Sequence, residues 1–135
     1  MRLLLIRHGQ TTGNVAGTLD SLIPGPELTP LGYQQARELP KTLDRHPIDA
    51  IYVSTLIRTH QTAGPLARAR QLHPIERDGL REATSGDYEA SSDAAAVADY
   101  LDRAKRWILG DLDVRMPGGE SGQELLTRVD EVVAE

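Results

Sequence analysis

Apolar residues form short continuous runs at three places along the chain. The run Leu3–Ile6 ends abruptly, which predicts a strand over residues 2–6 that is buried on both faces. A second strand is expected over residues 49–53, and a weaker third strand over residues 73–77. The segment after the first run, residues 9–28, is rich in glycine and proline, and we expect it to be a loop.

Two helix signals follow in the first half of the chain. Thr29-Pro30 combines a hydroxyl N-cap with a proline in the first turn, which predicts a helix start. Pro40 should break or kink this helix near its end, because a proline lacks the backbone N–H that a helix interior needs. Another helix is expected over residues 57–67, kinked at Gly64-Pro65.

The second half of the chain predicts two more helices, separated by a loop over residues 110–119. Ser92 is expected to cap the first of them. Ser121 and Glu124 form an S-x-x-E capping box for the last one. Both segments carry apolar residues at helical spacing, namely Val97, Leu101, Ala104 and Ile108 in the first and Leu125, Val129, Val132 and Val133 in the last.

The alternation of strands and helices predicts an α/β protein with a parallel sheet. Ligands of such sheets bind beyond the carboxyl ends of the strands. The segments at those places are Arg7-His8-Gly9, after the first predicted strand, and residues 54–58, after the second. We therefore look for the chemistry of this protein there.

Composition narrows the classes of function. A length of 135 residues allows one domain, over residues 1–135. The net charge of −5 argues against binding to nucleic acid or to an anionic membrane surface. No apolar run approaches the ~20 residues that span a bilayer, and no leader is recognisable, so we expect a cytoplasmic protein. The absence of cysteine excludes disulfides, zinc-thiolate sites and thiol catalysis.

His8 is the first candidate for catalysis. A neutral imidazole is a good nucleophile toward phosphorus, and a pKa near 6.5 makes the neutral form abundant at neutral pH. Arg7 would supply positive charge beside it, and Gly9 permits a tight turn. On this tripeptide alone, a structural histidine at a strand end is the better interpretation. A P-loop is excluded, because no Gly-Lys-Ser/Thr follows Gly13-Asn14.

Longer motifs change that balance. The segment from Arg7 to Asn14, RHGQTTGN, directly follows the first predicted strand and resembles the signature of the histidine phosphatase superfamily, also called the phosphoglycerate-mutase-like family. Further matching segments occur in the order of the family and together cover nearly the whole chain. They are Leu28-Thr29-Pro30-Leu31-Gly32, the segment from Ser54 to Ala63, Leu80-Arg81-Glu82 with Gly86-Asp87-Tyr88-Glu89 behind it, and Gly118-Gly119-Glu120-Ser121.

The resemblance implies a three-layer α/β/α fold with a mostly parallel central sheet, and a role for each matching residue. His8 would attack phosphorus and become phosphohistidine; Arg7 and Arg58 would hold the phosphoryl oxygens, with Asn14 shaping the site; and Glu82 would protonate the leaving oxygen and then activate water. Because two arginines can offset the charge of the phosphoryl group, no metal and no cofactor is expected. Taken alone, Arg58 would be a solvated helix residue and Glu82 one of 20 acidic residues.

The chain also departs from the family pattern. That pattern has a second histidine, followed by glycine, at the end of a late strand that lies between the first two strands of the sheet. None of the four histidines here has this context, and the late strand is missing. Its loss would leave two hydrogen-bonding edges facing a gap in the core. We expect a domain that is incomplete at its C-terminus, as a fragment of a longer chain. The alternative, that another chain fills the gap, leaves a homo-oligomer open.

Three functions follow as hypotheses. The first is a metal-independent phosphomonoesterase that works through phosphohistidine. The second is a phosphomutase, which the compact stretch from Gly86 to Ser92 does not favour, because mutases of this kind carry a helical insertion there. The third is a non-catalytic phosphate-binding remnant that lacks the second histidine. The partner in each case is a phosphorylated small molecule; sugar phosphates, nucleotides, phosphoglycerates and phosphoproteins all stay open as substrates.

Overall fold

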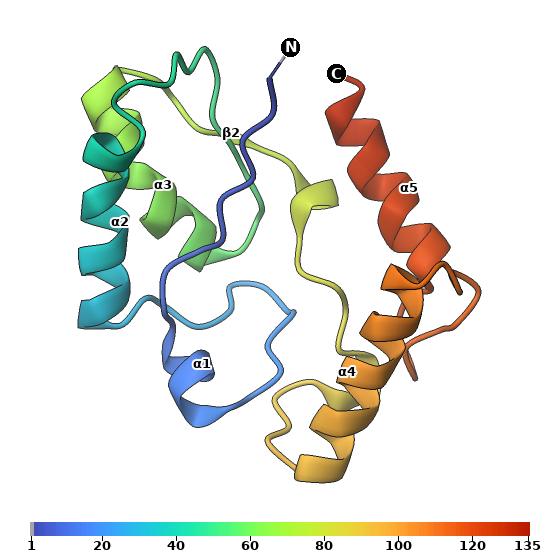
Figure 1. Ribbon diagram of the computed structural model, residues 1–135. Helices are drawn as coiled ribbons and strands as arrows, with labels where there is room; N and C mark the ends of the chain where they lie inside the picture. Colours follow the sequence, from blue (N-terminus) through green and yellow to red (C-terminus); the bar gives the residue numbers. More distant parts are fainter. Residues whose placement is uncertain (1) are drawn as a thin grey trace.

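The computed structural model describes residues 2–135 (Figure 1). In that view α2 and α3 lie on one side of the molecule, and α4 and α5 on the other. Within the described residues, no helix combines the length and the apolar character needed to cross a bilayer. The elements in chain order are α1 (Thr12–Ala16), α2 (Pro30–Thr42), β1 (Tyr52–Val53), α3 (Ile57–Arg70), β2 (Ile75–Glu76), the 3-10 helices η1 (Asp78–Leu80) and η2 (Gly86–Tyr88), α4 (Ala94–Ile108) and α5 (Gly122–Val133).

A small parallel sheet confirms the predicted α/β class. β1 pairs with β2 in parallel, and α3 forms the connection between them. Ile75 N–H donates to the carbonyl of Ile51 at 2.8 Å, and Arg77 N–H to the carbonyl of Val53 at 2.8 Å. The core lies between this sheet and the helices α2 and α3. Its buried members are Ile51, Val53, Ala63, Leu66 and Ala67, with Leu39, Leu43, Ile48 and Leu72 packed against them.

The prediction of a buried strand over residues 2–6 is wrong for this structure. The segment has no strand hydrogen bonding and is drawn as coil in Figure 1. Leu3 is 56% exposed and Leu5 is 87% exposed. A strand needs a partner for its backbone groups, and none of the described residues forms a ladder with this segment. The apolar run therefore marks residues suited to burial that lack a neighbour.

The predicted loop over residues 9–28 contains a helix, α1, that the sequence analysis did not predict. Thr11 caps α1: its hydroxyl accepts from Asn14 N–H, and the Asn14 side chain accepts from Thr11 N–H. This reciprocal cap is the signal that could have revealed the helix. Gly17 then ends it in the left-handed conformation, with φ of 70°.

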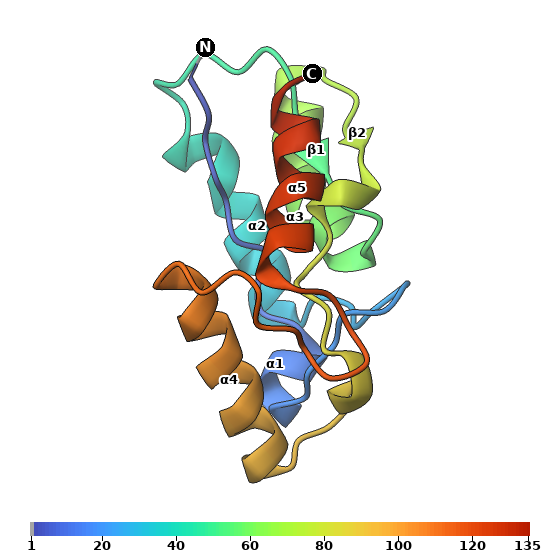
Figure 2. The same ribbon diagram turned by 90° about the vertical axis from the view of Figure 1, so that its right-hand side faces the viewer.

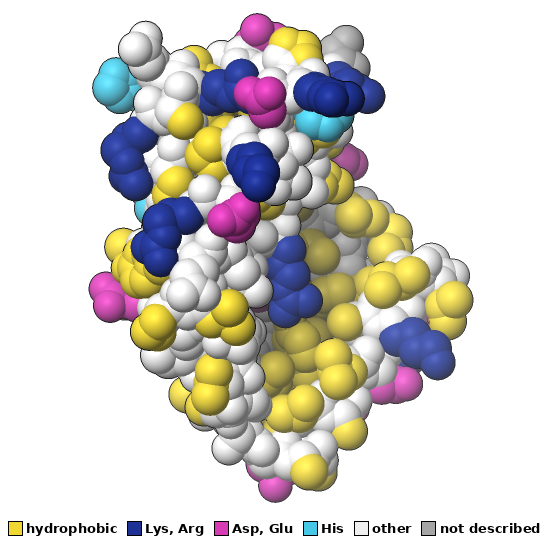
Figure 3. Space-filling model, turned by 60° about the vertical axis from the view of Figure 1, so that its left-hand side comes forward, with side chains coloured by type: hydrophobic (Ala, Val, Ile, Leu, Met, Phe, Trp, Pro, Cys, Tyr) yellow, Lys and Arg dark blue, Asp and Glu magenta, His cyan; other side chains and the backbone are white. Residues whose placement is uncertain are grey.

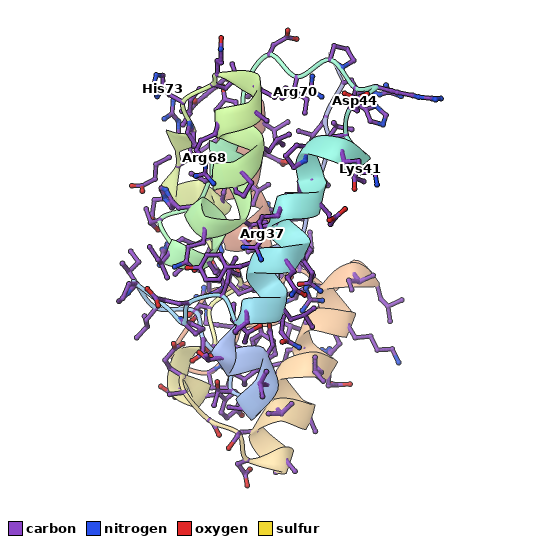
Figure 4. All side chains as sticks on the ribbon, turned by 90° about the vertical axis from the view of Figure 1, so that its left-hand side faces the viewer. Arg37, Lys41, Asp44, Arg68, Arg70 and His73 are labelled. Atoms are coloured by element: carbon purple, nitrogen blue, oxygen red, sulfur yellow. The ribbon has the colours of Figure 1, made fainter. Side chains whose placement is uncertain are left out.

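Helices α2 and α3 confirm the predicted starts, and neither of them ends at its proline. The Thr29 hydroxyl accepts from Gly32 N–H at 3.1 Å, with Pro30 as the first residue of α2. The helix continues for two residues beyond Pro40, and α3 continues through Gly64-Pro65 to Arg70. The two helices are joined at their ends, where Arg70 donates to the carbonyl of Leu43 at 2.7 Å (Figure 4).

Helix α4 corrects two details of the prediction. Its N-cap is Asp93 rather than Ser92, because the Asp93 carboxylate accepts from two backbone N–H groups of the first turn. Leu101 and Ile108 are 58% and 85% exposed, so the predicted apolar face is largely uncovered, while Trp107 is buried. Figure 2 shows α4 at the edge of the molecule, and Figure 3 shows hydrophobic side chains gathered along a hollow on another face. The helix has more apolar surface than this chain covers.

The last helix begins as predicted. The Ser121 hydroxyl accepts from Glu124 N–H, and the Glu124 carboxylate accepts from Ser121 N–H at 3.0 Å, which completes the capping box. Helix α5 then packs against η1. This contact brings the C-terminal part of the chain against the segment that carries Glu82.

Candidate active site

His8 stands at a tightly packed crossing of two chain segments. A Cβ atom on Gly9 would lie 2.6 Å from the carbonyl oxygen of Gly32 at the start of α2, so the following residue must be glycine. Gly9 N–H donates to the Thr62 hydroxyl at 3.0 Å, which ties the segment to α3 as well. His8 itself is half-buried, and its Nδ1 lies 2.8 Å from the Gly9 carbonyl oxygen.

This contact determines which nitrogen of His8 is available for chemistry. A carbonyl oxygen only accepts hydrogen bonds, so Nδ1 carries the proton and donates it. In the neutral ring Nε2 therefore holds the free electron pair. Nε2 is thus the ring nitrogen whose electron pair is open to a ligand in the cavity.

One cavity of about 600 Å³ contains all five residues of the predicted site. It is lined by residues from the N-terminal segment, α1, the start of α3 and the segment after η1. The predicted members that line it are Arg7, His8, Asn14, Arg58 and Glu82. Residues that lie up to 75 positions apart in sequence, from Arg7 to Glu82, therefore share one space.

Arg58 is the most unusual charge in this cavity. It is 3% exposed, and its Nη2 donates to the Asp20 carbonyl at 3.1 Å and lies 3.9 Å from a carboxylate oxygen of Glu82. Its Nε and Nη1 are buried and find no hydrogen-bond partner among the described residues. Burial lowers the pKa of Arg58, opposed by the carboxylates of Glu82 and Asp20. Arg58 thus places a buried positive charge in the cavity wall, which is suited to binding an anion.

Arg7 and Asn14 complete the cationic and polar side of the cavity. Arg7 is exposed and lines the cavity together with buried Arg58. The carboxamide oxygen of Asn14 accepts from Thr11 N–H at 2.9 Å, as part of the cap of α1. This leaves the NH₂ group of Asn14 as a donor on the same side chain. The cap of a short helix thus fixes a residue of the predicted site.

Glu82 is placed at the opening of the cavity. Its side chain is 47% exposed, and one carboxylate oxygen accepts from Ala83 N–H at 3.0 Å. The other oxygen is the one that faces Arg58. A carboxyl group in this position can exchange protons with solvent and with a ligand held by Arg58.

Electrostatics keep His8 in its neutral form. Burial is the largest cause that lowers the pKa of His8, and the charges of Arg58 and Arg7 lower it further. The hydrogen bond to the Gly9 carbonyl and the charge of Glu82 act in the opposite direction, without reversing the net shift. The neutral imidazole therefore predominates at neutral pH.

This shift predicts how the His8 ring responds to acid. Because the pKa of His8 is lowered from its ordinary value near 6.5, the reactive neutral form should persist below pH 6.5 and be lost only as the pH falls further. A ¹⁵N–¹H NMR titration of the histidine ring nitrogens measures this directly. An assigned His8 midpoint at or above 6.5 would contradict the electrostatic account.

A hydrogen-bonded cluster around Glu89, next to the cavity, was not predicted from the sequence. Glu89 accepts from Ser21 N–H at 2.9 Å and from the Ser21 hydroxyl at 2.6 Å, and the Ser85 hydroxyl also donates to it. Burial raises the pKa of Glu89, but these hydrogen bonds outweigh it and hold the pKa below its usual value. The cluster anchors the loop whose Asp20 carbonyl orients Arg58. Polar residues that lie more than 60 positions apart, such as Ser21 and Glu89, give no sequence signal of such a contact.

Tyr100 is a further missed residue of the cavity wall. It comes from α4 and lines the same cavity as His8. Its hydroxyl donates to the Ala83 carbonyl at 3.3 Å, and burial raises its pKa to about 12. The phenol therefore stays protonated and serves as a hydrogen-bond donor beside the Glu82 segment.

The fold is α/β with a parallel sheet, and its cavity brings together a histidine, two arginines and a glutamate. The chain belongs to the histidine phosphatase superfamily, branch 1, whose family model matches residues 3–135. It is 46% identical over 107 residues to the PE-PGRS family protein PE_PGRS11 of Mycobacterium tuberculosis, covering 78% of this chain and 18% of that protein. It is also 32% identical over 129 residues to phosphoserine phosphatase 1 of Hydrogenobacter thermophilus, covering 96% of this chain and 61% of that protein.

Solved structures agree with this assignment. Mycobacterial glucosyl-3-phosphoglycerate phosphatase in complex with VO₃ matches with a TM-score of 0.79 and 30% identity, covering 94% of this chain and 62% of that chain. The chain therefore spans less than two thirds of the length of each of these three relatives. The fold class of phosphoglycerate-mutase-like histidine phosphatases is confirmed.

Proposed function

We propose that this protein hydrolyses phosphomonoesters without a metal ion, through a phosphohistidine intermediate on His8. The observation that carries the proposal is Arg58, a buried guanidinium that lines one cavity with a histidine whose Nε2 is free. Membership of the histidine phosphatase superfamily and relatives named as phosphatases support it. The substrate is a phosphorylated small molecule, and the ordinary globular composition supports a cytoplasmic location.

The reaction proceeds in two steps. In the first, Nε2 of His8 forms a bond to phosphorus while the ester P–O bond breaks, and Glu82 gives its proton to the departing oxygen. In the second, the Glu82 carboxylate takes a proton from water, whose oxygen attacks phosphorus and releases His8 with inorganic phosphate. Arg58 and Arg7 bind the phosphoryl oxygens throughout, because phosphoryl transfer depends mainly on positioning and on offsetting negative charge.

A second candidate is a protein that binds phosphate esters without hydrolysing them. Of the four histidines, His8 alone lines the cavity in the part of the chain described here. The family pattern expects a second histidine at the phosphoryl group. The buried Arg58 would still bind an anion in its absence, so the two candidates differ in turnover rather than in binding.

One assay separates the candidates. p-Nitrophenyl phosphate is offered to the 135-residue chain and to the product of the full reading frame, with and without EDTA, and phosphate binding is measured by calorimetry. Turnover that resists EDTA supports the phosphatase. Binding without turnover in both proteins supports the second candidate, and the lack of both contradicts the site.

Replacing Arg58 with lysine should weaken phosphate binding on the order of 10²-fold. Each charge-assisted hydrogen bond contributes about 1.5–3 kcal/mol, and an ammonium cannot reproduce the planar fork of donors. Arg58→Lys also removes the bond to the Asp20 carbonyl. Calorimetry with inorganic phosphate and with vanadate measures the loss.

Arg68→Lys is the matched control, since Arg68 is exposed near the end of the same helix and does not line the cavity. It should leave phosphate binding unchanged. Equal affinity of the Arg58→Lys variant and the wild type would show that Arg58 does not bind the anion. Arg7→Lys should likewise fail to preserve full affinity, for the same geometric reason.

A further inference from the structure

Arg128 of helix α5 is joined to the segment that carries Glu82. Its Nη1 donates to the carbonyl of Gly79 at 2.6 Å and to the carbonyl of Arg81 at 2.9 Å. Its Nη2 donates to the carbonyl of Glu82 itself at 3.1 Å. One side chain therefore satisfies three backbone acceptors within four residues, and it is only 18% exposed.

Glu120 extends this hold to the other end of the segment. Its carboxylate accepts from Arg128 Nε at 2.9 Å and Nη2 at 2.7 Å, and from Thr84 N–H at 3.0 Å. Burial raises the pKa of Glu120, but the bonds from Arg128 and Thr84 outweigh this and hold the pKa below its ordinary value. Glu120 is thus ionised and paired. Together Arg128 and Glu120 hold residues 79–84 in place by hydrogen bonds on both sides of Glu82.

Close packing leaves this contact little freedom. A Cβ atom on Gly79 would lie 2.5 Å from the backbone oxygen of Arg128 and 2.8 Å from the Val132 side chain. Gly119, next to Glu120, lies in the same way against the Thr84 side chain, at 2.5 Å from a built Cβ. Helix α5 therefore meets the segment at close range, backbone to backbone at Gly79.

We propose that the Arg128–Glu120 pair positions Glu82 for proton transfer, an inference that rests on the proposed phosphatase function. The Glu82 side chain has little of its own to hold it: it is 47% exposed, bonds to the adjacent Ala83 N–H, and lies 3.9 Å from Arg58. Its place at the cavity is determined by its backbone. A proton donor must stand within hydrogen-bond reach of the leaving oxygen, and a misplacement of ~1 Å can cost about 10²-fold in rate.

The test compares Arg128→Lys with the wild type, both made from the full reading frame. Lysine keeps the charge and cannot bond to three carbonyls and a carboxylate together. With an alkyl phosphate the rate of phosphohistidine formation should fall about 10²-fold. With an aryl phosphate, whose phenolate leaves without a proton, it should change little. Glu120→Gln, which weakens the same pair, should show the same selective loss.

Arg115→Lys is the matched control. Arg115 also binds a carboxylate through two nitrogens, at 2.8 Å and 2.7 Å to Glu124 of α5, but this pair is exposed and has no hydrogen bond to residues 79–84 among the described contacts. Amide hydrogen exchange on the 135-residue chain gives a second measurement. Arg128→Lys should speed exchange in residues 80–84 and leave α2 and α3 unchanged, whereas Arg115→Lys should leave residues 80–84 unchanged.

The outcomes separate this inference from the function on which it rests. A wild-type protein that never forms phosphohistidine overturns the proposed function. A wild type that does form it, with Arg128→Lys slowing alkyl and aryl substrates equally, overturns the positioning role and leaves a general structural one. Unchanged exchange in residues 80–84 overturns it as well. Loss confined to alkyl substrates, together with faster exchange there, supports it.

Discussion

Replacing His8 with alanine should abolish the covalent phosphoryl adduct and reduce turnover on the order of 10⁴-fold or more, as the loss of a covalent nucleophile does in other enzymes. His8 is the histidine that lines the cavity in the described chain, and its Nδ1 contact with Gly9 leaves Nε2 free to attack. Alanine offers no atom that could replace this nitrogen. The cavity with Arg58 stays in place, so the variant should still bind phosphate.

The adduct is measured directly. Incubation of the wild-type protein with a ³²P-labelled phosphomonoester should give a phosphoryl group that is labile in acid and stable in base, and His8→Ala should not acquire it. His60→Ala is the control, because His60 lies on α3 and pairs with Glu76 at 2.9 Å, away from the cavity lining. An adduct that persists in His8→Ala would place the nucleophile elsewhere.

The position of Arg7 and His8 at the cavity could be predicted from a local signal, whereas Arg58 and Glu82 were assigned from the resemblance to the family. Arg7 and His8 directly follow an apolar run, and Arg58 follows the second strand and its polar end. Residues 2–6 form no strand in the structure, yet Arg7, His8 and Arg58 still line one cavity. The caps at Thr29 and Ser121 were equally local, since each depends on residues within one turn of the helix.

The errors share a different physical cause. The apolar run of residues 2–6 and the exposed Leu101 and Ile108 of α4 show that a residue is suited to burial, but a pattern does not say what buries it. Strand formation requires a second backbone, and the described chain offers none beside residues 2–6. The local pattern correctly identified these residues as apolar, but it wrongly predicted that they are buried.

The residues that position the cavity side chains could not be predicted from the sequence. Thr62 accepts from Gly9 N–H and donates to the Arg58 carbonyl at 2.7 Å, and Arg128 donates to carbonyls near Glu82. Their partners are mainly backbone groups, which every residue carries. Side-chain types therefore reveal the groups that act on a ligand better than the groups that position them.

Replacing Glu82 with glutamine should have an effect that depends on the leaving group. Glutamine keeps the shape of the side chain and an oxygen that can accept from Ala83 N–H, but it has no acidic proton to give. An alkyl phosphate releases a strongly basic alkoxide, so loss of the donor should slow formation of phosphohistidine by about 10²–10⁴-fold. An aryl phosphate with an acidic phenol should be affected much less in this step, because its oxygen departs as a stable anion.

A phosphate dianion held by Arg58 would lie beside the Glu82 carboxyl group, since Glu82 and Arg58 approach to 3.9 Å. Pre-steady-state bursts separate formation of the phosphohistidine from its hydrolysis. Glu76→Gln, at an exposed carboxylate paired with His60 outside the cavity, should leave both bursts unchanged. Equal losses of Glu82→Gln on alkyl and aryl substrates would remove Glu82 from the acid role and leave it as a carboxylate that helps to orient Arg58.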